Sequence, residues 1–297
     1  MNWRGVFPAI TTPFREDLAV DHEFLARHVD RLIRAGCTGL VPMGSLGESA
    51  TLEPEEKRAI LATCRAALAG RAPLVAGIAA LSTAQAVATA RLAHERGCDG
   101  LMVLPPYVYR PDPRETAAHF STVIGATALP CMLYNNPIAY GTDVTAEELA
   151  ALAKRHANLE AVKESSGDVR RVTAIRSLLG GRLAVFMGVD DLILEGVAAG
   201  ATGWIAGLVN ALPRESVRLF DLAAAGKFEE ARPLYAWFLP LLRLDVVPKF
   251  VQLIKLVQQE AGCGSERVRP PRLPLAGAER DEALALIRES LKTRPKI

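Results

Sequence analysis

The chain has 297 residues, half of them apolar, and its 35 Lys and Arg side chains nearly balance 33 Asp and Glu, which leaves a net charge of +2. This composition is typical of a globular protein and gives no reason to expect binding to nucleic acid or to a membrane surface. The N-terminal segment lacks the zones of a signal peptide and no apolar run reaches about 18 residues, so we expect a cytoplasmic protein without membrane spans.

Short apolar runs bounded by glycine, proline or asparagine alternate along the chain with amphipathic segments of helical length. The runs predict eight strands, at Gly5–Ile10, Gly39–Met43, Leu74–Ile78, Gly100–Leu104, Pro130–Asn135, Leu159–Glu164, Leu183–Gly188 and Gly203–Gly207. The other segments predict helices at His22–Ala35, Pro54–Ala69, Thr83–Gly97, Pro113–Ala126, Ala146–His156, Val169–Leu179, Asp191–Ala199 and Pro213–Ala225.

Regular alternation of strand and helix, with strands apolar on both faces, favours a parallel sheet covered by helices. Eight such units favour closure into a (β/α)8 TIM barrel over residues 1–225. No GxGxxG motif follows the first strand, which argues against a dinucleotide-binding fold.

Residues 226–297 predict three further helices, at Phe228–Leu242, Pro248–Ala261 and Gly277–Lys292. This piece is small and no flexible linker precedes it. We therefore expect a C-terminal helical extension packed on the barrel rather than an independent domain.

Cysteines and histidines give no sign of a disulfide framework or a metal site. The five cysteines are an odd number without a CxxC pair, so we expect reduced, mostly buried thiols. The five histidines never fall at metal-binding spacing. The sequence predicts no metal and no cofactor.

Lys163 interrupts the apolar run at Leu159–Glu164. Burial penalises the ammonium form of a lysine, so a desolvated Lys163 would be partly free amine, the form that attacks carbonyl groups. A simpler alternative is a strand-end lysine that reaches solvent or pairs with Glu164. The other seven lysines occupy polar or helical stretches where a solvated ammonium is expected: Lys57, Lys154, Lys227, Lys249, Lys255, Lys292 and Lys296.

Further reactive groups are expected near Lys163, because catalytic groups in this fold collect at the carboxyl ends of the strands. Imine chemistry on a 2-oxo acid needs a proton shuttle beside the lysine, and Tyr134, at the end of the preceding strand, has the right chemistry. The turn from Gly44 to Gly47 can present backbone N–H groups to a substrate carboxylate.

At these positions the chain resembles the dihydrodipicolinate synthase and N-acetylneuraminate lyase family. The resemblance rests on segments spread over nearly the whole chain: Gly5–Phe14, Gly44–Leu52, Pro105–Tyr107, Leu133–Asn135, Val162–Ser165 and Gly188–Asp191. It implies a covalent imine on Lys163, Tyr134 as proton shuttle and Ser45 as a hydroxyl that relays protons to Tyr134. It also implies a substrate site formed by Gly44, Leu46, Gly47, Tyr107, Tyr140, Gly188 and Ile205, and a homodimer or homotetramer.

Two departures from the synthase pattern bear on the substrate. Val108 stands where the synthase has a relay tyrosine donated by a neighbouring subunit, and Tyr107, Tyr109 or Tyr140 would replace it only if the loops differ. Ala139 stands where the synthase has an arginine that grips the carboxylate of aspartate semialdehyde.

We therefore expect a lysine Schiff-base lyase that acts on a 2-oxo acid or its cyclic imine. The segments Leu133–Pro137, Tyr140–Gly141 and Gly264–Arg272 most resemble the branch that deaminates 4-hydroxy-1-pyrroline-2-carboxylate. The alternatives are an aldolase or dehydratase for 2-keto-3-deoxy sugar acids, 4-hydroxy-tetrahydrodipicolinate synthase, and a non-catalytic barrel that binds a 2-oxo acid.

Overall fold

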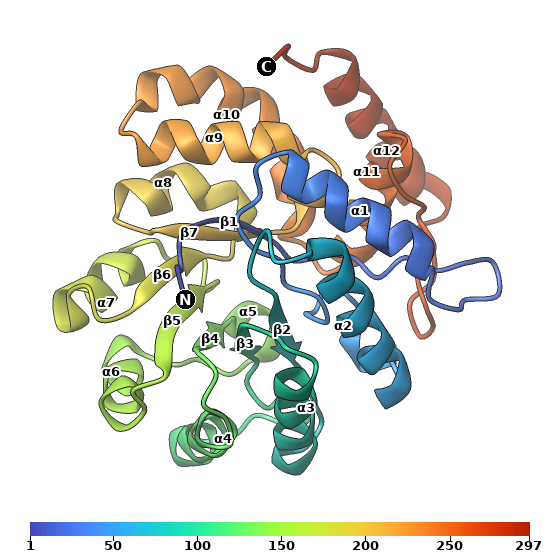
Figure 1. Cartoon of the computed structure of the whole chain (residues 1–297). Helices are drawn as coiled ribbons and strands as arrows, with labels where there is room; N and C mark the ends of the chain where they lie inside the picture. Colours follow the sequence, from blue (N-terminus) through green and yellow to red (C-terminus); the bar gives the residue numbers. More distant parts are fainter.

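The computed structural model describes residues 1–297, and one parallel sheet of seven strands forms its centre (Figure 1). The order across the sheet is β1-β7-β6-β5-β4-β3-β2. The strands are β1 (Gly5–Pro8), β2 (Val75–Ile78), β3 (Gly100–Val103), β4 (Cys131–Asn135), β5 (Leu159–Glu164), β6 (Ala184–Met187) and β7 (Gly203–Ala206).

The gap between β1 and β2 is filled by the segment predicted as the second strand. It forms only isolated parallel bridges, from Val41 to Ala9 and from Leu40 to Leu74, so the prediction of a full strand at Gly39–Met43 is wrong. Pro42 has no N–H to donate, and Met43 has a φ of 62°, which ends the extended conformation. The bridges still close the sheet into a barrel, as expected for the fold.

The helices form a ring around the strands (Figure 1). Three of them begin with a capping box, at Glu53, Asp112 and Thr145, and in the first two a proline follows the capping residue. The helices of the ring are α1 (His22–Arg34), α2 (Pro54–Leu68), α3 (Thr83–Glu95), α4 (Pro113–Gly125), α6 (Ala146–Arg155), α7 (Arg170–Leu179), α8 (Ile193–Ala198) and α9 (Pro213–Ala224).

Short helices that the sequence did not predict lie in the loops after the strands and after α10. They are α5 (Pro137–Tyr140) and the 3-10 helices η1 (Ser49–Thr51), η2 (Asp190–Leu192), η3 (Leu208–Asn210) and η4 (Arg243–Asp245). Each has three or four residues, too few for an apolar period to appear in the sequence.

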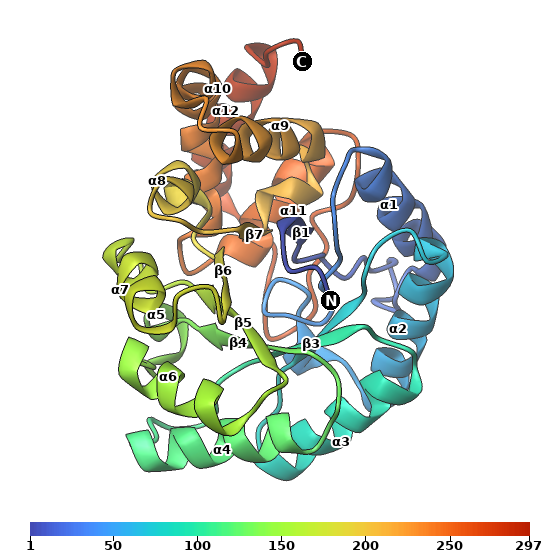
Figure 2. The same cartoon turned by 60° about the vertical axis from the view of Figure 1, so that its left-hand side comes forward.

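The C-terminal helices gather at one side of the barrel in both views (Figures 1 and 2). α10 (Phe228–Leu242) packs on α9, and α11 (Phe250–Glu260) packs on η3 and η4. α12 (Gly277–Lys292) covers α10 and α11. None of the helices has the length and apolar character needed to cross a membrane.

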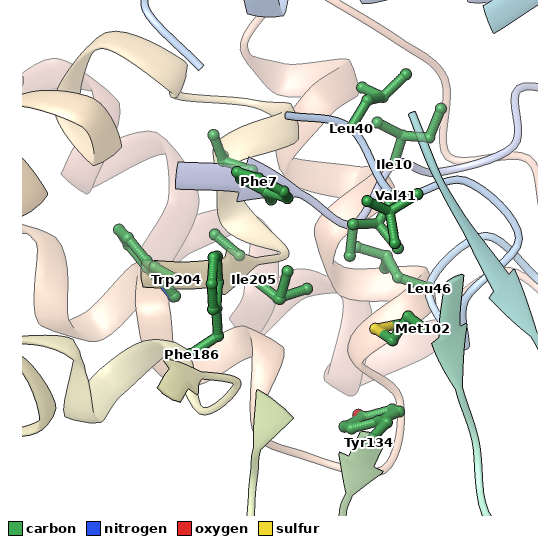
Figure 3. Packing of buried hydrophobic residues seen from close by; sticks show 14 of the residues in the cluster. Phe7, Ile10, Leu40, Val41, Leu46, Met102, Tyr134, Phe186, Trp204 and Ile205 are labelled. Atoms are coloured by element: carbon green, nitrogen blue, oxygen red, sulfur yellow. The ribbon is translucent and has the colours of Figure 1, made fainter. Parts of the chain in front are cut away.

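Apolar side chains of all these elements form a single core of 80 buried residues. Inside the barrel, Ile205, Leu46 and Met102 lie between Phe186 and Tyr134 (Figure 3). The barrel is therefore filled with side chains up to the level of Lys163, and reacting groups can meet solvent only at its carboxyl end.

Candidate active site

The sheet register places Lys163 at the centre of the carboxyl end of the barrel. Lys163 on β5 is paired with Tyr134 on β4 and with Phe186 on β6. The Lys163 side chain is 7% exposed and its Nζ lies 4.1 Å from the centre of the Tyr134 ring. The structure thus brings together the two residues that the sequence singled out first.

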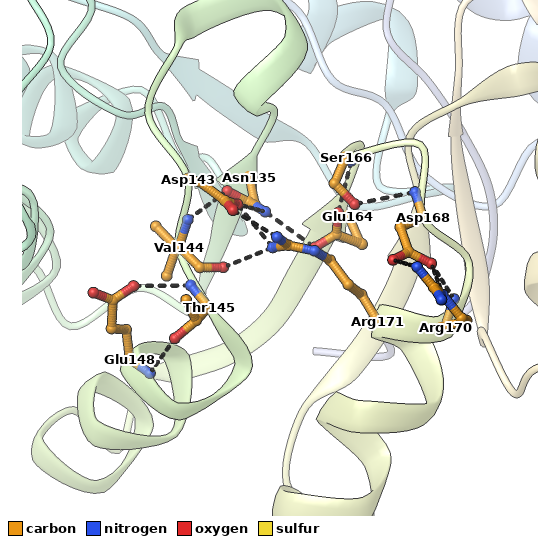
Figure 4. Close-up of polar contacts among 10 residues, drawn as sticks. All are labelled: Asn135, Asp143, Val144, Thr145, Glu148, Glu164, Ser166, Asp168, Arg170 and Arg171. Atoms are coloured by element: carbon orange, nitrogen blue, oxygen red, sulfur yellow. Dashed lines mark hydrogen bonds and ion pairs between the residues drawn. The ribbon is translucent and has the colours of Figure 1, made fainter.

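Lys163 does not pair with Glu164, because successive strand residues face opposite sides of the sheet. Glu164 points out of the barrel, where it accepts hydrogen bonds from Asn135 Nδ2 at 3.1 Å and from the Ser166 N–H at 2.7 Å (Figure 4). Arg171 of α7 lies on the same side and binds Asp143. No carboxylate forms an ion pair with Lys163 within 4 Å, so its amine is free to react.

Space beside Lys163 depends on Gly188, which follows β6. A methyl group at Gly188 would overlap the Lys163 side chain and the Ser165 hydroxyl. Ser165 is two residues beyond Lys163 and shares its face of the strand, and its Oγ is buried without a hydrogen-bond partner. Ser165 was not among the predicted site residues, although its spacing from Lys163 was a usable signal.

The turn from Gly44 to Gly47 lies at the carboxyl end of the bridging segment, close to the barrel axis. The Thr12 hydroxyl donates to the Gly47 carbonyl at 2.6 Å and holds the turn in place. The N–H groups of Ser45 and Leu46 donate to no group of the protein. The turn can therefore offer two amide donors to an anionic group, as the sequence predicts.

The hydroxyl relay differs from the one expected. The Ser45 hydroxyl is hydrogen-bonded to the hydroxyl of Tyr140, and the Tyr134 hydroxyl instead accepts from Asn136 Nδ2 at 2.9 Å. The structure therefore has no direct hydrogen bond between the hydroxyls of Ser45 and Tyr134. Tyr140 stands between them, with its ring centre 5.9 Å from that of Tyr134 and 5.7 Å from that of Tyr107.

Tyr140 reaches this place because of the short helix α5. The Asn136 side chain accepts a hydrogen bond from the Ala139 N–H and caps α5, which turns Tyr140 inward. Val108 of the same chain is 60% exposed, so the aromatic hydroxyl beside Ser45 in this chain is that of Tyr140. Burial raises the pKa of Tyr140, so its hydroxyl stays protonated and can donate.

The turn is also held from outside by a buried ion pair. Lys255 of α11 donates to Glu48 Oε1 at 2.5 Å and to the Arg267 carbonyl at 2.7 Å. Lys255 is only 1% exposed, so the prediction that it is solvated is wrong, and Lys163 is not the only buried lysine. Burial lowers the pKa of Lys255 to about 8. Because Lys255 is committed to Glu48, it is not a free nucleophile.

Two carboxylates near Lys163 were also missed. Asp190 in η2 is fully buried and Asp245 in η4 reaches in from the C-terminal extension. Burial raises the pKa of both carboxyl groups, and the charge of Lys163 opposes that rise in each case. Asp190 belongs to the motif at Gly188–Asp191, which was a usable signal for it. Asp245 is an isolated acidic residue after an apolar helix, and no motif around it indicates a place in the site.

A hollow of about 1020 Å³ lies at the opposite end of the barrel, around residues at or just before the starts of strands, such as Gly5, Cys98 and Pro130. It contains none of the predicted site residues. The candidate site for imine formation is therefore at the other end of the barrel, where Lys163 lies.

Comparison with known proteins agrees with this geometry. A model of the Dihydrodipicolinate synthetase family matches residues 2–290. A 4-hydroxy-tetrahydrodipicolinate synthase of Geotalea uraniireducens is 34% identical over 291 residues, which cover 97% of this chain and 98% of that protein. The enzyme of the same name from Methanothrix thermoacetophila is 33% identical over 293 residues, with 97% and 96% covered.

Solved structures show the same fold. The 4-hydroxy-tetrahydrodipicolinate synthase of Methylacidiphilum fumariolicum SolV has a TM-score of 0.92, 29% identity and 98% coverage of both chains. The dihydrodipicolinate synthase of Acinetobacter baumannii in complex with pyruvate has a TM-score of 0.92, 28% identity and coverage of 97% and 99%. The chain therefore belongs to the dihydrodipicolinate synthetase family of Schiff-base-forming lyases and has its TIM-barrel fold with a C-terminal helical extension.

Proposed function

We propose that this enzyme forms an imine between Lys163 and a 2-oxo acid or its cyclic imine, with Tyr134 as the proton shuttle. The observation that carries the proposal is the buried Lys163 amine, without an ion-pair partner, over the Tyr134 ring at 4.1 Å. The free N–H groups of Ser45 and Leu46 would hold the substrate carboxylate. Ile205 and Gly188 would border the imine.

For the substrate, we propose 4-hydroxy-1-pyrroline-2-carboxylate, from which the enzyme would release ammonia. A five-membered cyclic imine has one carboxylate, which matches the single amide turn at Ser45 and Leu46. Ala139, at the position of the synthase arginine, offers no charge to a second carboxylate, and the neighbouring Tyr140 offers a neutral hydroxyl. An unpaired carboxylate in a site that excludes water would cost several kcal/mol.

The reaction would begin with attack of Lys163 on the C=N carbon and opening of the ring. The bound imine then carries the former ring nitrogen as a free amine. Proton removal at C3 through Tyr134 gives an enamine, from which the C4 hydroxyl leaves as water. Rearrangement and hydrolysis release ammonia and a 2-oxo acid, and they free Lys163.

4-Hydroxy-tetrahydrodipicolinate synthesis is the second candidate, because the relatives described above carry that name. It requires aspartate semialdehyde to place its carboxylate near α5. A surface arginine, Arg110, lies against Gly141 after α5, but it is exposed rather than held in the site. Ala139 in place of the synthase arginine is therefore the observation that supports the cyclic imine.

The two candidates are separated by assays at equal enzyme concentration. We expect ammonia release from 4-hydroxy-1-pyrroline-2-carboxylate, measured with a coupled ammonia assay. We expect little dihydrodipicolinate from pyruvate and aspartate semialdehyde, measured by absorbance. Faster condensation than ammonia release would reject the deaminase proposal in favour of the synthase.

We also propose that the enzyme is a homodimer or homotetramer. Large apolar side chains are exposed beside the site: Val108 at 60%, Tyr109 at 57% and Ile138 at 72%. An exposed apolar cluster of this kind is typical of an interface. Another solved relative, with 26% identity and a TM-score of 0.90, is described as the first monomeric dihydrodipicolinate synthase variant. Sedimentation velocity should show a dimer or larger, and replacing Val108 and Ile138 by aspartate should shift it toward monomer.

A further inference from the structure

Asp245 is placed in the site by an element far from the barrel strands in the sequence. It ends the 3-10 helix Arg243–Asp245, which follows α10 in the C-terminal extension. Its carboxylate lies against Gly207, just after β7, where a methyl group on the glycine would overlap it. Its Oδ1 is closed to solvent and has no hydrogen-bond partner. A buried polar atom without a partner costs stability, and such atoms are concentrated at functional sites.

Both oxygens of the neighbouring Asp190 carboxylate accept hydrogen bonds from the protein. It accepts hydrogen bonds from Trp204 Nε1 at 2.9 Å, from the Gly207 N–H at 3.1 Å and from the Leu208 N–H at 2.9 Å. These bonds hold the loop after β7, so Asp190 has a structural task. Of the two carboxylates, only Asp245 has an oxygen without a hydrogen-bond partner.

The surroundings of Asp245 favour its protonated form. Burial raises its pKa well above the usual value, and the charges of Asp190 and Asp191 raise it further, while Lys163 opposes them. The fourth charged group nearby, Arg243, is turned toward Asp191 at 3.7 Å. A carboxyl group whose pKa is raised holds its proton more readily than an ordinary carboxyl group, and this suits it to act as a general acid.

Asp245 and Tyr134 lie on opposite sides of Lys163. The sheet order β7-β6-β5-β4 puts Tyr134 on the strand before Lys163, and Asp245 beside the loop two strands after it. Because Gly207 and Gly188 have no side chain, Asp245 can lie directly against the first, and Lys163 and the Ser165 hydroxyl against the second. A substrate joined to Lys163 would thus have Tyr134 at one flank and the free carboxyl group of Asp245 at the other.

We infer that Asp245 is the acid that protonates the group leaving from C4 of the Lys163-bound substrate, a role that rests on the proposed function. The enamine electron pair re-forms the C2=N bond, the C2=C3 double bond moves to C3=C4, and the C4–O bond breaks. The Asp245 proton passes to the departing hydroxyl, which leaves as water. Asp245 is left as a carboxylate, and solvent returns its proton before the next turnover.

The test compares two reactions of Asp245→Asn, Tyr134→Phe and the wild-type enzyme. Exchange of the pyruvate methyl protons in D2O, followed by NMR, needs imine formation and proton removal but no leaving group. Ammonia release from 4-hydroxy-1-pyrroline-2-carboxylate needs both and the departure of water. Asp245→Asn should lower ammonia release by about 100-fold, the size expected when a reaction loses its general acid. It should change the rate of pyruvate exchange by less than about twofold, because exchange does not use that acid. Tyr134→Phe should lower both reactions by about 100-fold.

For Asp245→Asn, a retained pyruvate exchange rate also shows that the variant is folded. If Asp245→Asn loses exchange as well, Asp245 supports the whole site and the inference is wrong. If Asp245→Asn retains ammonia release, the inference is wrong and the proposed function stands. If the wild-type enzyme exchanges pyruvate protons but releases no ammonia, the proposed substrate is wrong, and the inference falls with it.

Discussion

Lys163→Ala should abolish the covalent labelling of the enzyme by borohydride in the presence of pyruvate and lower turnover by roughly 10⁴-fold or more. The size of the loss follows from removing the nucleophile, after which only binding and positioning remain. Loss of activity should not reflect unfolding, because Lys163 makes no ion pair and its removal takes a poorly solvated amine out of the barrel. The melting temperature should stay equal or rise.

Mass spectrometry of the peptides after reduction identifies the labelled lysine. Lys255 is the natural comparison, because it is the other buried lysine but is held by Glu48 and the Arg267 carbonyl. Lys57→Ala, at a half-buried helix position, is a control that should keep both labelling and turnover. Label on Lys255 or on Lys57 in the wild-type enzyme would contradict the role given to Lys163.

The sequence was sufficient for the parts of the fold that depend on local patterns. Helix starts at Pro54 and Pro113 agree with the structure because a capping residue and a proline act within one turn. The prediction of a full second strand was wrong because Pro42 has no N–H to donate and the left-handed Met43 ends the extended conformation, and a run of apolar residues does not show this.

The site was predictable where the strand register decides it, and less so where loops and the C-terminal extension do. Lys163 and Tyr134 lie side by side because they are paired near the carboxyl ends of two adjacent parallel strands. The partnership of Ser45 with Tyr140 depends on α5, whose four residues carry no periodic signal. Lys255 and Asp245 carry no local sign of their partners, since Glu48 lies 207 residues from Lys255.

The ion pair between Lys255 and Glu48 should be the charge interaction with the largest effect on stability. Both side chains are almost fully buried, at 2% and 0% exposure. Lys255→Met would leave the Glu48 carboxylate with two partners, the Arg269 N–H at 3.0 Å and the more distant Arg272 guanidinium at 3.9 Å. Breaking a buried pair by removing one partner costs about 3–5 kcal/mol, because the other charge stays buried.

Urea unfolding should therefore show Lys255→Met to be less stable than the wild-type enzyme by about 3 kcal/mol or more. The matched control is Lys249→Met, which breaks the ion pair with Glu279 in which both side chains are about half exposed. Surface pairs of that kind contribute at most about 1 kcal/mol. Equal losses in the two variants would show that burial of the Glu48 pair does not matter.

The double variant Glu48→Gln with Lys255→Met separates the charge from the packing. It removes both charges, so it should be more stable than Lys255→Met alone. Because Glu48 follows the turn from Gly44 to Gly47, Lys255→Met should also weaken carboxylate binding and raise the KM for the substrate. The double variant should recover stability more than it recovers KM, since a neutral amide in place of the Glu48 carboxylate accepts a weaker hydrogen bond from the Arg269 N–H. Full recovery of both would mean that the ion pair holds the fold but does not position the turn.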